Sequence, residues 1–306
     1  MKRGTKIFAT VLCLVLFAVM AMGSGSTDGV DKSVSSVSSS GASNDANTGS
    51  GNGGSGSSSA EVSVEEQVVY DANDIKITVN GIEDGWMGTE LKMLIENNSG
   101  KNITVQTRNA NVNGFMVNTS MSADVAAGKK ANDEMTIMTS GLKDCGITDI
   151  ANIEFCFHIF ESDTWDTLYD TDVISVKTSI ADTYKQEVDD SGDILVDTNG
   201  IKIVTKGLSA NDSFWGPGVI LYIENNSNQN VTVQVRDVSV NGFMVTSTMS
   251  EDVVAGKKAM SAVQFYSSDL ADNSITDINE VELYFHIFDE KSWNTIFDSN
   301  VINIKF

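Results

Sequence analysis

Histidine, cysteine and proline are scarce in this chain of 306 residues, and the shortage excludes several classes of protein. The sequence holds two histidines, three cysteines and one proline. A structural zinc site takes four nitrogen or sulfur ligands, and a thiol enzyme takes a cysteine with a base beside it. The composition therefore leaves little material for a metalloenzyme or a thiol enzyme.

Positive charge is also scarce. The chain has 20 Lys and Arg against 42 Asp and Glu, so its formal net charge is −22 and its isoelectric point is about 4.2. Proteins that bind nucleic acid without sequence specificity neutralise phosphates with clustered Lys and Arg, and anionic lipid attracts the same clusters. The charge balance argues against both kinds of partner.

Catalytic sequence motifs are missing as well. The chain contains no G-x-S-x-G, H-E-x-x-H or P-loop pattern, which are the marks of serine hydrolases, zinc proteases and nucleotide-binding enzymes. We therefore predict no catalytic residue, no metal site and no cofactor, and we interpret the protein as a non-enzyme.

The N-terminus has the three-part pattern of a secretory signal peptide. Lys2, Arg3 and Lys6 precede an apolar run over residues 7–22, and small residues follow it. The run is shorter than the ~20 apolar residues of a comfortable membrane span. We predict a signal peptide over residues 1–23 and an extracytoplasmic protein, secreted or associated with the cell surface. The alternative is that this segment is retained as a membrane anchor.

A segment of low complexity follows. Residues 24–60 are nearly all Ser, Gly, Asn, Asp, Thr and Ala, without an aromatic residue. Such a composition buries too little apolar surface to offset the entropy of ordering. We predict a disordered tether over residues 24–66, and whether it serves as a spacer stays open.

The remainder of the chain consists of two similar copies of one sequence, an internal repeat. At an offset of 128 residues, V-N-G-F-M-V from Val112 matches the segment from Val240, and F-H-I-F from Phe157 matches the segment from Phe285. About half of the positions aligned in this way are identical. Solenoid repeats span about 20–50 residues, so a repeat this long is a domain with its own core. We predict a first copy at residues 67–180, a polar linker at 181–192 and a second copy at 193–306.

Apolar and polar residues alternate within each copy. Over residues 153–159, Ile, Phe, Phe and Ile alternate with Glu, Cys and His. This period of two indicates antiparallel strands with one buried and one wet face. Asn113-Gly114 and the matching Asn241-Gly242 predict type I′ hairpins, because Asn and Gly tolerate positive φ.

These patterns predict an all-β fold. Seven or eight strands in roughly 114 residues fit two tandem immunoglobulin-like antiparallel β-sandwich domains after the disordered tether. A small closed barrel is the alternative fold. Residues 140–146 and 267–274 are expected to form single helical turns.

The motifs together resemble a known group of domains. The motifs that carry the resemblance are D-A-N-D-I-K-I-T-V-N-G-I with its counterpart in the second copy, I-E-N-N-S, V-N-G-F-M-V, A-G-K-K-A, and F-H-I-F before a Trp hairpin. The chain resembles secreted, often lipid-anchored, immunoglobulin-like (telokin-like) domains of unknown function from Gram-positive anaerobes. The resemblance covers both copies, about three quarters of the chain. It implies an extracytoplasmic β-sandwich and carries over no catalytic residue. The lipobox of the lipid-anchored members is missing here.

The histidines and cysteines of the two copies are further candidate site residues. The alternation places His158 and His286 on the outward face of equivalent strands, where half-exposed side chains are expected. Cys145 and Cys156 occur only in the first copy. A secreted protein can form disulfides, so two alternatives stay open for these cysteines. They either form a disulfide with each other or remain free thiols.

The acids of the linker are a candidate cation site. Asp189, Asp190 and Asp193 lie close together, but the spacing of an EF-hand loop is absent. Weak calcium binding and a solvated acidic surface are the two interpretations.

Four tryptophans are the candidate binding residues. Trp86 and Trp215 lie in a loop that is two residues longer in the second copy, and Trp165 and Trp293 lie in the hairpin after F-H-I-F. An exposed aromatic ring anchors protein interfaces or packs on the C–H face of a sugar ring. The alternative is that each Trp closes one end of the sandwich core.

Two functions follow from these observations. The first is a non-catalytic extracytoplasmic interaction module for an unknown extracellular protein. The second is a carbohydrate-binding module that uses the loop tryptophans on wall or environmental glycan. Convergence of Trp with polar side chains on one open sheet face would favour the second function, and scattered positions would favour the first.

Overall fold

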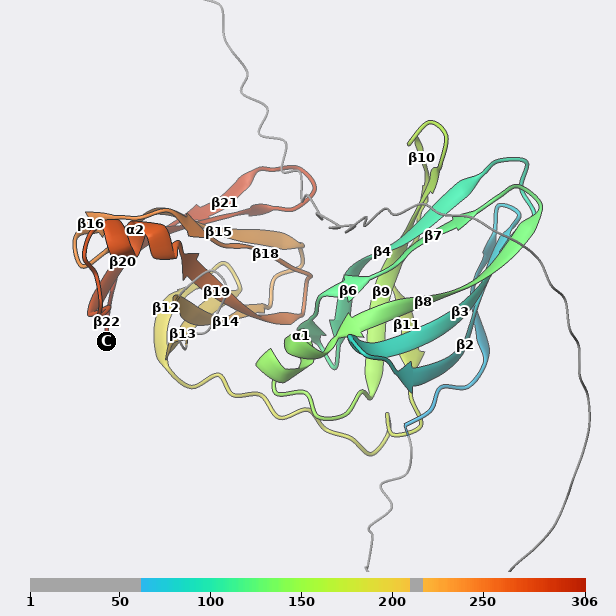
Figure 1. Cartoon of the computed structure of the whole chain (residues 1–306). Helices are drawn as coiled ribbons and strands as arrows, with labels where there is room; N and C mark the ends of the chain where they lie inside the picture. The colour runs from blue at the N-terminus through green and yellow to red at the C-terminus, as the bar shows by residue number, and fades with distance from the viewer. Residues whose placement is uncertain (1–61, 210–216) are drawn as a thin grey trace, which may run out of the picture. The chain divides into compact units, whose positions relative to one another are not determined.

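The computed structural model describes residues 62–209 and 217–306, which form β-strands for the most part (Figure 1). The predicted signal peptide, most of the predicted tether and Trp215 lie outside the described residues. No helix in the described part of the chain is long and apolar enough to cross a membrane. The predicted all-β class is confirmed.

The first copy contains two antiparallel sheets. Its elements are β1 (Gln67–Ala72), β2 (Ile75–Asp84), β3 (Gly88–Asn97), β4 (Ile103–Val112), β5 (Phe115–Met116), β6 (Thr119–Ser120), β7 (Ser122–Val125), β8 (Lys129–Met138), α1 (Thr139–Asp144), β9 (Asn152–Glu161), β10 (Thr167–Asp170) and β11 (Ile174–Lys177). One sheet has the order β1-β2-β3-β8-β6, and the other has the order β10-β9-β4-β5, with β11 also on β9 and β7 also on β4.

The second copy has the same pairing order. Its elements are β12 (Asp193–Thr198), β13 (Ile201–Leu208), β14 (Gly218–Asn225), β15 (Val231–Val240), β16 (Phe243–Met244), β17 (Ser247–Thr248), β18 (Ser250–Val253), β19 (Lys258–Phe265), α2 (Ser267–Asp272), β20 (Glu280–Asp289), β21 (Thr295–Asp298) and β22 (Ile302–Lys305). One sheet runs β12-β13-β14-β19-β17, and it is continuous with the β10-β9-β4-β5 sheet of the first copy because β19 pairs with β5. The other runs β16-β15-β20-β21, with β18 on β15 and β22 on β20. The two predicted helical turns are confirmed as α1 and α2.

Each copy has eleven described strands where the sequence predicted seven or eight. The difference arises because the chain changes sheets after the Asn-Gly hairpin. In the first copy β5 pairs with β4, β6 crosses to β8 in the other sheet, and β7 returns to β4. Each of these strands has only two to four residues. The described strands of a copy form two separate sheets, so the barrel alternative is wrong.

The period-two alternation corresponds to the buried face of each sheet. Ile153, Phe155 and Phe157 of β9 are all 0% exposed. They belong to one core cluster with Ile77 of β2 and Leu91 of β3, which lie in the other sheet. The two sheets of the copy therefore enclose a single apolar core, as in an immunoglobulin-like sandwich.

The Asn-Gly turns have the predicted geometry. Asn113 and Gly114 have φ values of +52° and +86°, as a type I′ hairpin requires. Asn113 Oδ1 also accepts hydrogen bonds from the backbone N–H groups of Ala151 at 2.9 Å and Asn152 at 3.0 Å. The matching turn of the second copy has φ values of +50° and +82°.

Segments that flank the first copy bond to it. The Ser179 N–H donates to the carbonyl of Ser63 over 2.8 Å, and Val64 packs against the first core. Asn113 Nδ2 donates to Gln186 Oε1 over 3.1 Å. The sequence assigned Ser63 and Val64 to the tether and Gln186 to the linker, and all three contact the first copy.

One inward position differs in character between the copies. β18 places Glu251 opposite the buried Val233 of β15, and the corresponding residue of the first copy is the buried Ala123. Burial raises the pKa of the Glu251 carboxyl to about 7, although a hydrogen bond with Ser261 acts in the opposite direction. A partly buried carboxyl group therefore stands in the second copy at the position where the first copy has a buried alanine.

We expect Glu251→Gln to stabilise the protein at pH 8 and to change it little at pH 4. A carboxyl with a raised pKa in the folded state contributes stability that is complete below its ordinary pKa of 4.5 and is lost as the pH rises through about 7. The variant should gain on the order of 1–3 kcal/mol at pH 8, measured by urea unfolding at both pH values. Glu187→Gln, at an exposed carboxylate, is the control. An equal effect of Glu251→Gln at both pH values would contradict the raised pKa.

Candidate functional site

Side chains on the outward face of β9 and β4 form a row across the second sheet of the first copy. Cys156, His158 and Phe160 alternate with the buried residues of β9. The register places three residues of β4 opposite them, in the same order: Arg108, Gln106 and Thr104. We call these six side chains the outer row. The outer row of the second copy consists of Tyr284, His286, Phe288, Arg236, Gln234 and Thr232.

The histidine of each row is bonded to a carboxylate on the neighbouring strand. His158 Nδ1 lies 2.6 Å from Asp170 Oδ1, and His286 Nδ1 lies 2.6 Å from Asp298 Oδ1. An ionised carboxylate can only accept a hydrogen bond, so Nδ1 carries the proton and donates it. The histidine side chains are 10% and 12% exposed. They lie on the outward face as predicted, but they are more buried than expected because the aspartate and a phenylalanine cover them.

A stack of aromatic rings continues from each histidine. The ring centroids of His158 and Phe160 are 5.5 Å apart, and those of Phe160 and Trp165 are 5.5 Å apart with 16° between the planes. Trp165 lies in the hairpin between β9 and β10 and is 76% exposed, so the indole face that does not touch Phe160 is open to solvent. In the second copy Phe288 and Trp293 stack at 5.4 Å and 15°, and Trp293 is 73% exposed. We call each stacked Trp–Phe pair a platform.

Both platform tryptophans have a left-handed backbone. The φ value is +65° at Trp165 and +62° at Trp293. This conformation costs roughly 1–2 kcal/mol for a residue with a Cβ. Within residues 161–166, the tryptophan is the one residue that is identical to its counterpart in residues 289–294. The turn therefore keeps an exposed tryptophan with a left-handed backbone in both copies, where it covers a buried phenylalanine.

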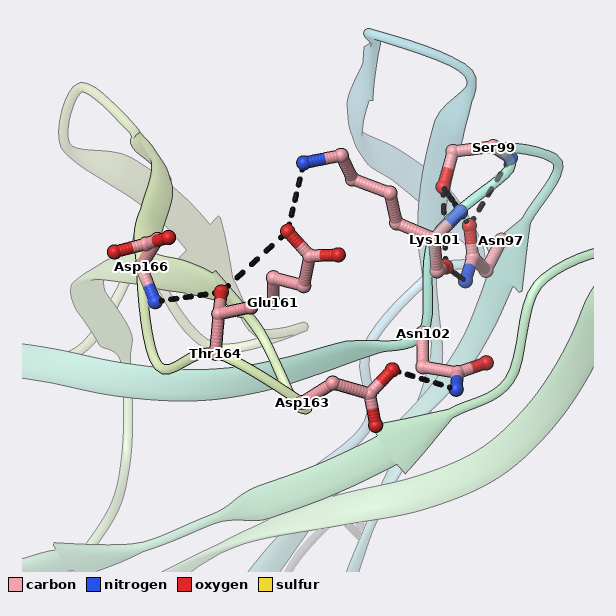
Figure 2. Close-up of polar contacts among 8 residues, drawn as sticks. All are labelled: Asn97, Ser99, Lys101, Asn102, Glu161, Asp163, Thr164 and Asp166. Atoms are coloured by element: carbon pink, nitrogen blue, oxygen red, sulfur yellow. Dashed lines mark hydrogen bonds and ion pairs between the residues drawn. The ribbon is translucent and has the colours of Figure 1, made fainter.

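A polar cluster fixes the hairpin that carries Trp165 (Figure 2). Lys101 Nζ lies 2.7 Å from Glu161 Oε2, and this bond raises the pKa of Lys101 above its usual value. Thr164 Oγ1 donates to the same carboxylate oxygen over 3.5 Å and accepts from the Asp166 N–H over 3.3 Å. The Trp165 N–H donates to the carbonyl of Glu161 over 2.8 Å. The hairpin is thus bonded within itself and to the turn between β3 and β4.

That turn is held by a buried carboxamide (Figure 2). Asn97 is 0% exposed, and its Nδ2 donates to the carbonyls of Lys101 at 2.8 Å and Val125 at 2.9 Å. Its Oδ1 accepts from the N–H of Ser99 at 3.0 Å and from the Ser99 hydroxyl at 2.6 Å. Asn225 makes the same four bonds in the second copy. This network explains why the E-N-N-S motif recurs.

A further bond joins the turn to the hairpin in each copy. Asn102 Nδ2 donates to Asp163 Oδ2 over 3.1 Å (Figure 2), and Asn230 Nδ2 donates to Glu290 Oε2 over 3.0 Å. Gln229 replaces the lysine of the Lys–Glu ion pair in the second copy. The two hairpins are therefore anchored to equivalent turns by partly different side chains.

Arginine occupies the end of each outer row that lies farthest from the platform. The sequence contains three arginines, and the two outside the N-terminal segment are Arg108 and Arg236, at matching positions. Both are exposed, and neither has a hydrogen bond or an ion pair among the described residues. Arg108 lies four residues along β4 from Thr104, about 13 Å at the usual rise of a strand. Sequence reasoning missed these residues, although the matched positions of the arginines were a visible signal.

Trp86 lies apart from the platform. It is 92% exposed in the hairpin between β2 and β3. The ten residues of β3, about 33 Å of strand, separate it from the turn that bonds the Trp165 hairpin. The interpretation that the tryptophans close the core is wrong for Trp86, Trp165 and Trp293, and Trp215 lies outside the described residues.

The cysteines of the first copy are free thiols. Cys145, directly after α1, is buried, and Cys156 in the outer row is half-buried. Burial raises the pKa of Cys145 to about 11 and raises that of Cys156 above its usual value. Both groups are therefore protonated and unreactive at neutral pH.

The acids of the linker are paired with lysines of β13. Asp189 Oδ2 lies 2.8 Å from Lys206 Nζ, and Asp190 Oδ2 lies 2.8 Å from Lys202 Nζ. Hydrogen bonds from Lys206 and Ser191 lower the pKa of Asp189. Within the described ranges, no group of His, Cys, Asp or Glu residues is arranged to hold a metal ion.

The His–Asp pairs lack the third member of a hydrolytic triad. In the described part of the chain, neither histidine has a hydrogen bond to a Ser, Thr or Cys side chain. The neighbouring outer-row residue on the same strand is Cys156 in the first copy and Tyr284 in the second. A triad needs a nucleophile within hydrogen-bond reach of the imidazole, and the geometry supplies none that the two copies share.

Comparisons with known proteins gave matches only among solved structures. No protein-family model and no curated protein matches the chain. The YadV chaperone matches with a TM-score of 0.22 and 10% identity over 71% of this chain and 92% of that chain. The Salmonella enterica SafA pilin–SafB chaperone complex matches with 0.22 and 11% identity over 78% and 98%. The CsuC–CsuE chaperone–tip adhesion subunit complex of Acinetobacter baumannii Csu pili matches with 0.19 and 11% over 70% and 90%.

We expect Asn97→Ala to destabilise the first copy by about 2–4 kcal/mol, because it leaves two carbonyls and two Ser99 donors without their buried partner. Urea unfolding followed by circular dichroism measures the change. Asn98→Ala is the matched control, because Asn98 is exposed, and surface substitutions stay within about 0.5 kcal/mol. Equal effects of the two substitutions would contradict the anchoring role of Asn97.

We expect Trp165→Gly to be more stable than Trp165→Ala by about 1 kcal/mol, because glycine has no Cβ penalty at a φ of +65°. Both variants remove the stacking on Phe160, so the difference isolates the backbone. Urea unfolding of the two variants measures it. The same pair of substitutions at Thr164, where no positive φ occurs, should favour alanine. The alanine variant being the more stable at position 165 would contradict the left-handed conformation.

Proposed function

We propose that the protein is a non-catalytic extracytoplasmic interaction module in which each copy presents its platform and outer row to a partner. The observation that carries this proposal is the exposed tryptophan with a left-handed backbone, stacked on an outward phenylalanine, in both copies. An aromatic ring that is held rigidly in solvent is suited to anchoring a partner at little cost in side-chain entropy.

The surrounding contacts support a binding role over a catalytic one. The Trp165 hairpin is bonded to the β3–β4 turn, which is itself fixed by the buried Asn97. Such bonds organise the ring before a partner arrives, and preorganised sites lose less entropy on binding. The absence of a shared nucleophile beside the described His–Asp pairs favours a site that binds without bond cleavage.

The placement outside the cytoplasm is supported by the sequence. Lys2, Arg3 and Lys6 before the apolar run have the order of a secretory signal. N-terminal sequencing of the protein from a culture supernatant checks this part of the proposal, with cleavage near residue 23 as the expected result. Protein that stays with the membrane fraction and keeps its full N-terminus would support the anchor alternative.

We expect the double variant Trp165→Ala, Trp293→Ala to lose at least tenfold in retention on the native cell surface. The secreted chain is incubated with intact cells and with isolated wall, and bound protein is quantified. Trp86→Ala is the matched control, because it removes an equally exposed tryptophan away from the platforms.

The proposal fails if all three proteins are retained equally or if none is retained. Circular dichroism and urea unfolding of each variant exclude loss of fold as the cause. The platform tryptophans are exposed and belong to neither core cluster, so the fold is expected to persist.

A further inference from the structure

We propose that each platform and its outer row form a binding site for a neutral glycan, with a sugar ring stacked on the open indole face of Trp165 or Trp293. This inference rests on the proposed interaction function and names the class of partner. The carrying observation is that a free aromatic face and a line of polar side chains lie on one outward sheet surface in both copies.

The platform has the chemistry that a sugar ring needs. A pyranose presents a face of C–H groups, which packs on the electron-rich face of an aromatic ring. Phe160 supports the indole of Trp165 from below at an interplanar angle of 16° and leaves the opposite face free. The open indole face is a flat apolar surface of the size of one sugar, and it is far smaller than the ~800 Å² that each partner buries in an ordinary protein interface.

The outer row supplies both kinds of hydrogen-bonding group. Sugar hydroxyls donate and accept, so a site for them needs donors and acceptors together. The guanidinium of Arg108 is an exposed donor, and the side chain of Asp170 is a 64% exposed acceptor that His158 holds at one oxygen. Gln106 offers a carboxamide whose Nε2 bonds to Ser122 over 3.3 Å. The centre of a protein interface is poor in charged residues, and this surface is not.

Charge favours a neutral ligand over either kind of polyelectrolyte. The net charge of −22 repels a polyanion. At the site itself the unpaired arginine of each outer row lies on the same surface as an exposed aspartate, so neither sign of charge is clustered there. A neutral glycan needs no such cluster, and arginine and aspartate can both bond to its hydroxyls.

The length and the duplication of the site fit a polymer. About 13 Å of strand separates the level of Phe160 from that of Arg108, which is longer than one sugar ring. The same row occurs twice in the chain with five of its six residues identical. Two equal sites in one molecule suit a ligand whose units recur, because a second contact to the same polymer adds to the first.

The test uses the secreted chain and a fixed panel of probes: cellohexaose, chitohexaose, laminarihexaose, mannohexaose and maltohexaose, with polylysine and polygalacturonate as charged probes. Isothermal titration calorimetry gives affinity and stoichiometry, and tryptophan fluorescence reports contact with the indole. We expect at least one neutral hexaose to bind at two sites. Its Kd should change less than threefold between 50 and 500 mM salt, because an uncharged ligand is little affected by screening.

Single variants separate the two copies. We expect Trp165→Ala and Trp293→Ala each to halve the stoichiometry with the Kd of the remaining site unchanged, and the double variant to lose binding at least tenfold. Trp86→Ala should retain two sites. Arg108→Gln together with Arg236→Gln should weaken binding several-fold and keep the stoichiometry, since the guanidinium contributes hydrogen bonds and not the stacking surface.

Three results would overturn the glycan assignment. One is a panel without binding that depends on the platform tryptophans. Another is glycan binding that the double tryptophan variant retains. The third is tryptophan-dependent binding of polylysine or polygalacturonate alone. Retention on cells that needs both tryptophans, survives periodate oxidation of the wall and is lost after protease treatment would refute the glycan and leave the interaction function in place. Retention that is unchanged by the tryptophan substitutions would refute both the glycan assignment and the proposed interaction function.

Discussion

The two-residue repeat of β9 and β20 is the constraint on which the core and the candidate site both depend. Each strand lies inside its sheet, so one set of its side chains has to fill the sandwich, and the alternate set has to face outward. Phe155 and Phe157 fill the core of the first copy, and His158 and Phe160 then begin the outer row. A shift of one residue would exchange the two sets and destroy both at once.

Anchoring extends from the core to the surface through a short chain of contacts. The buried Asn97 fixes the turn between β3 and β4, that turn bonds the hairpin after β9, and the hairpin presents Trp165 above Phe160. The ring is therefore exposed and at the same time fixed in position. The second copy reaches the same result with Asn225 and with a different set of bonds to its hairpin. The arrangement of the aromatic rings is kept while the residues that support it vary.

Sequence patterns were informative where the signal is local. The alternation in residues 153–159 predicted a strand with a buried apolar face, and the Asn-Gly pairs predicted tight hairpins, because both depend on neighbours a few residues apart. The change of sheets by β5, β6 and β7 was missed, since such short strands carry no periodicity. The burial of His158 was underestimated because Asp170 comes from another strand.

The sequence by itself determined the all-β class, the internal repetition and the outward direction of the histidines, because each follows from composition, spacing or period. Only the tertiary structure decided which candidate residues share a surface. It placed Trp165 in one stack with Phe160 and His158, and it placed Arg108 on the same sheet surface. It placed Trp86 at the far end of β3, away from this surface. The physical reason is that strand register and hairpin anchoring set these distances, and both arise from contacts between residues far apart in the chain.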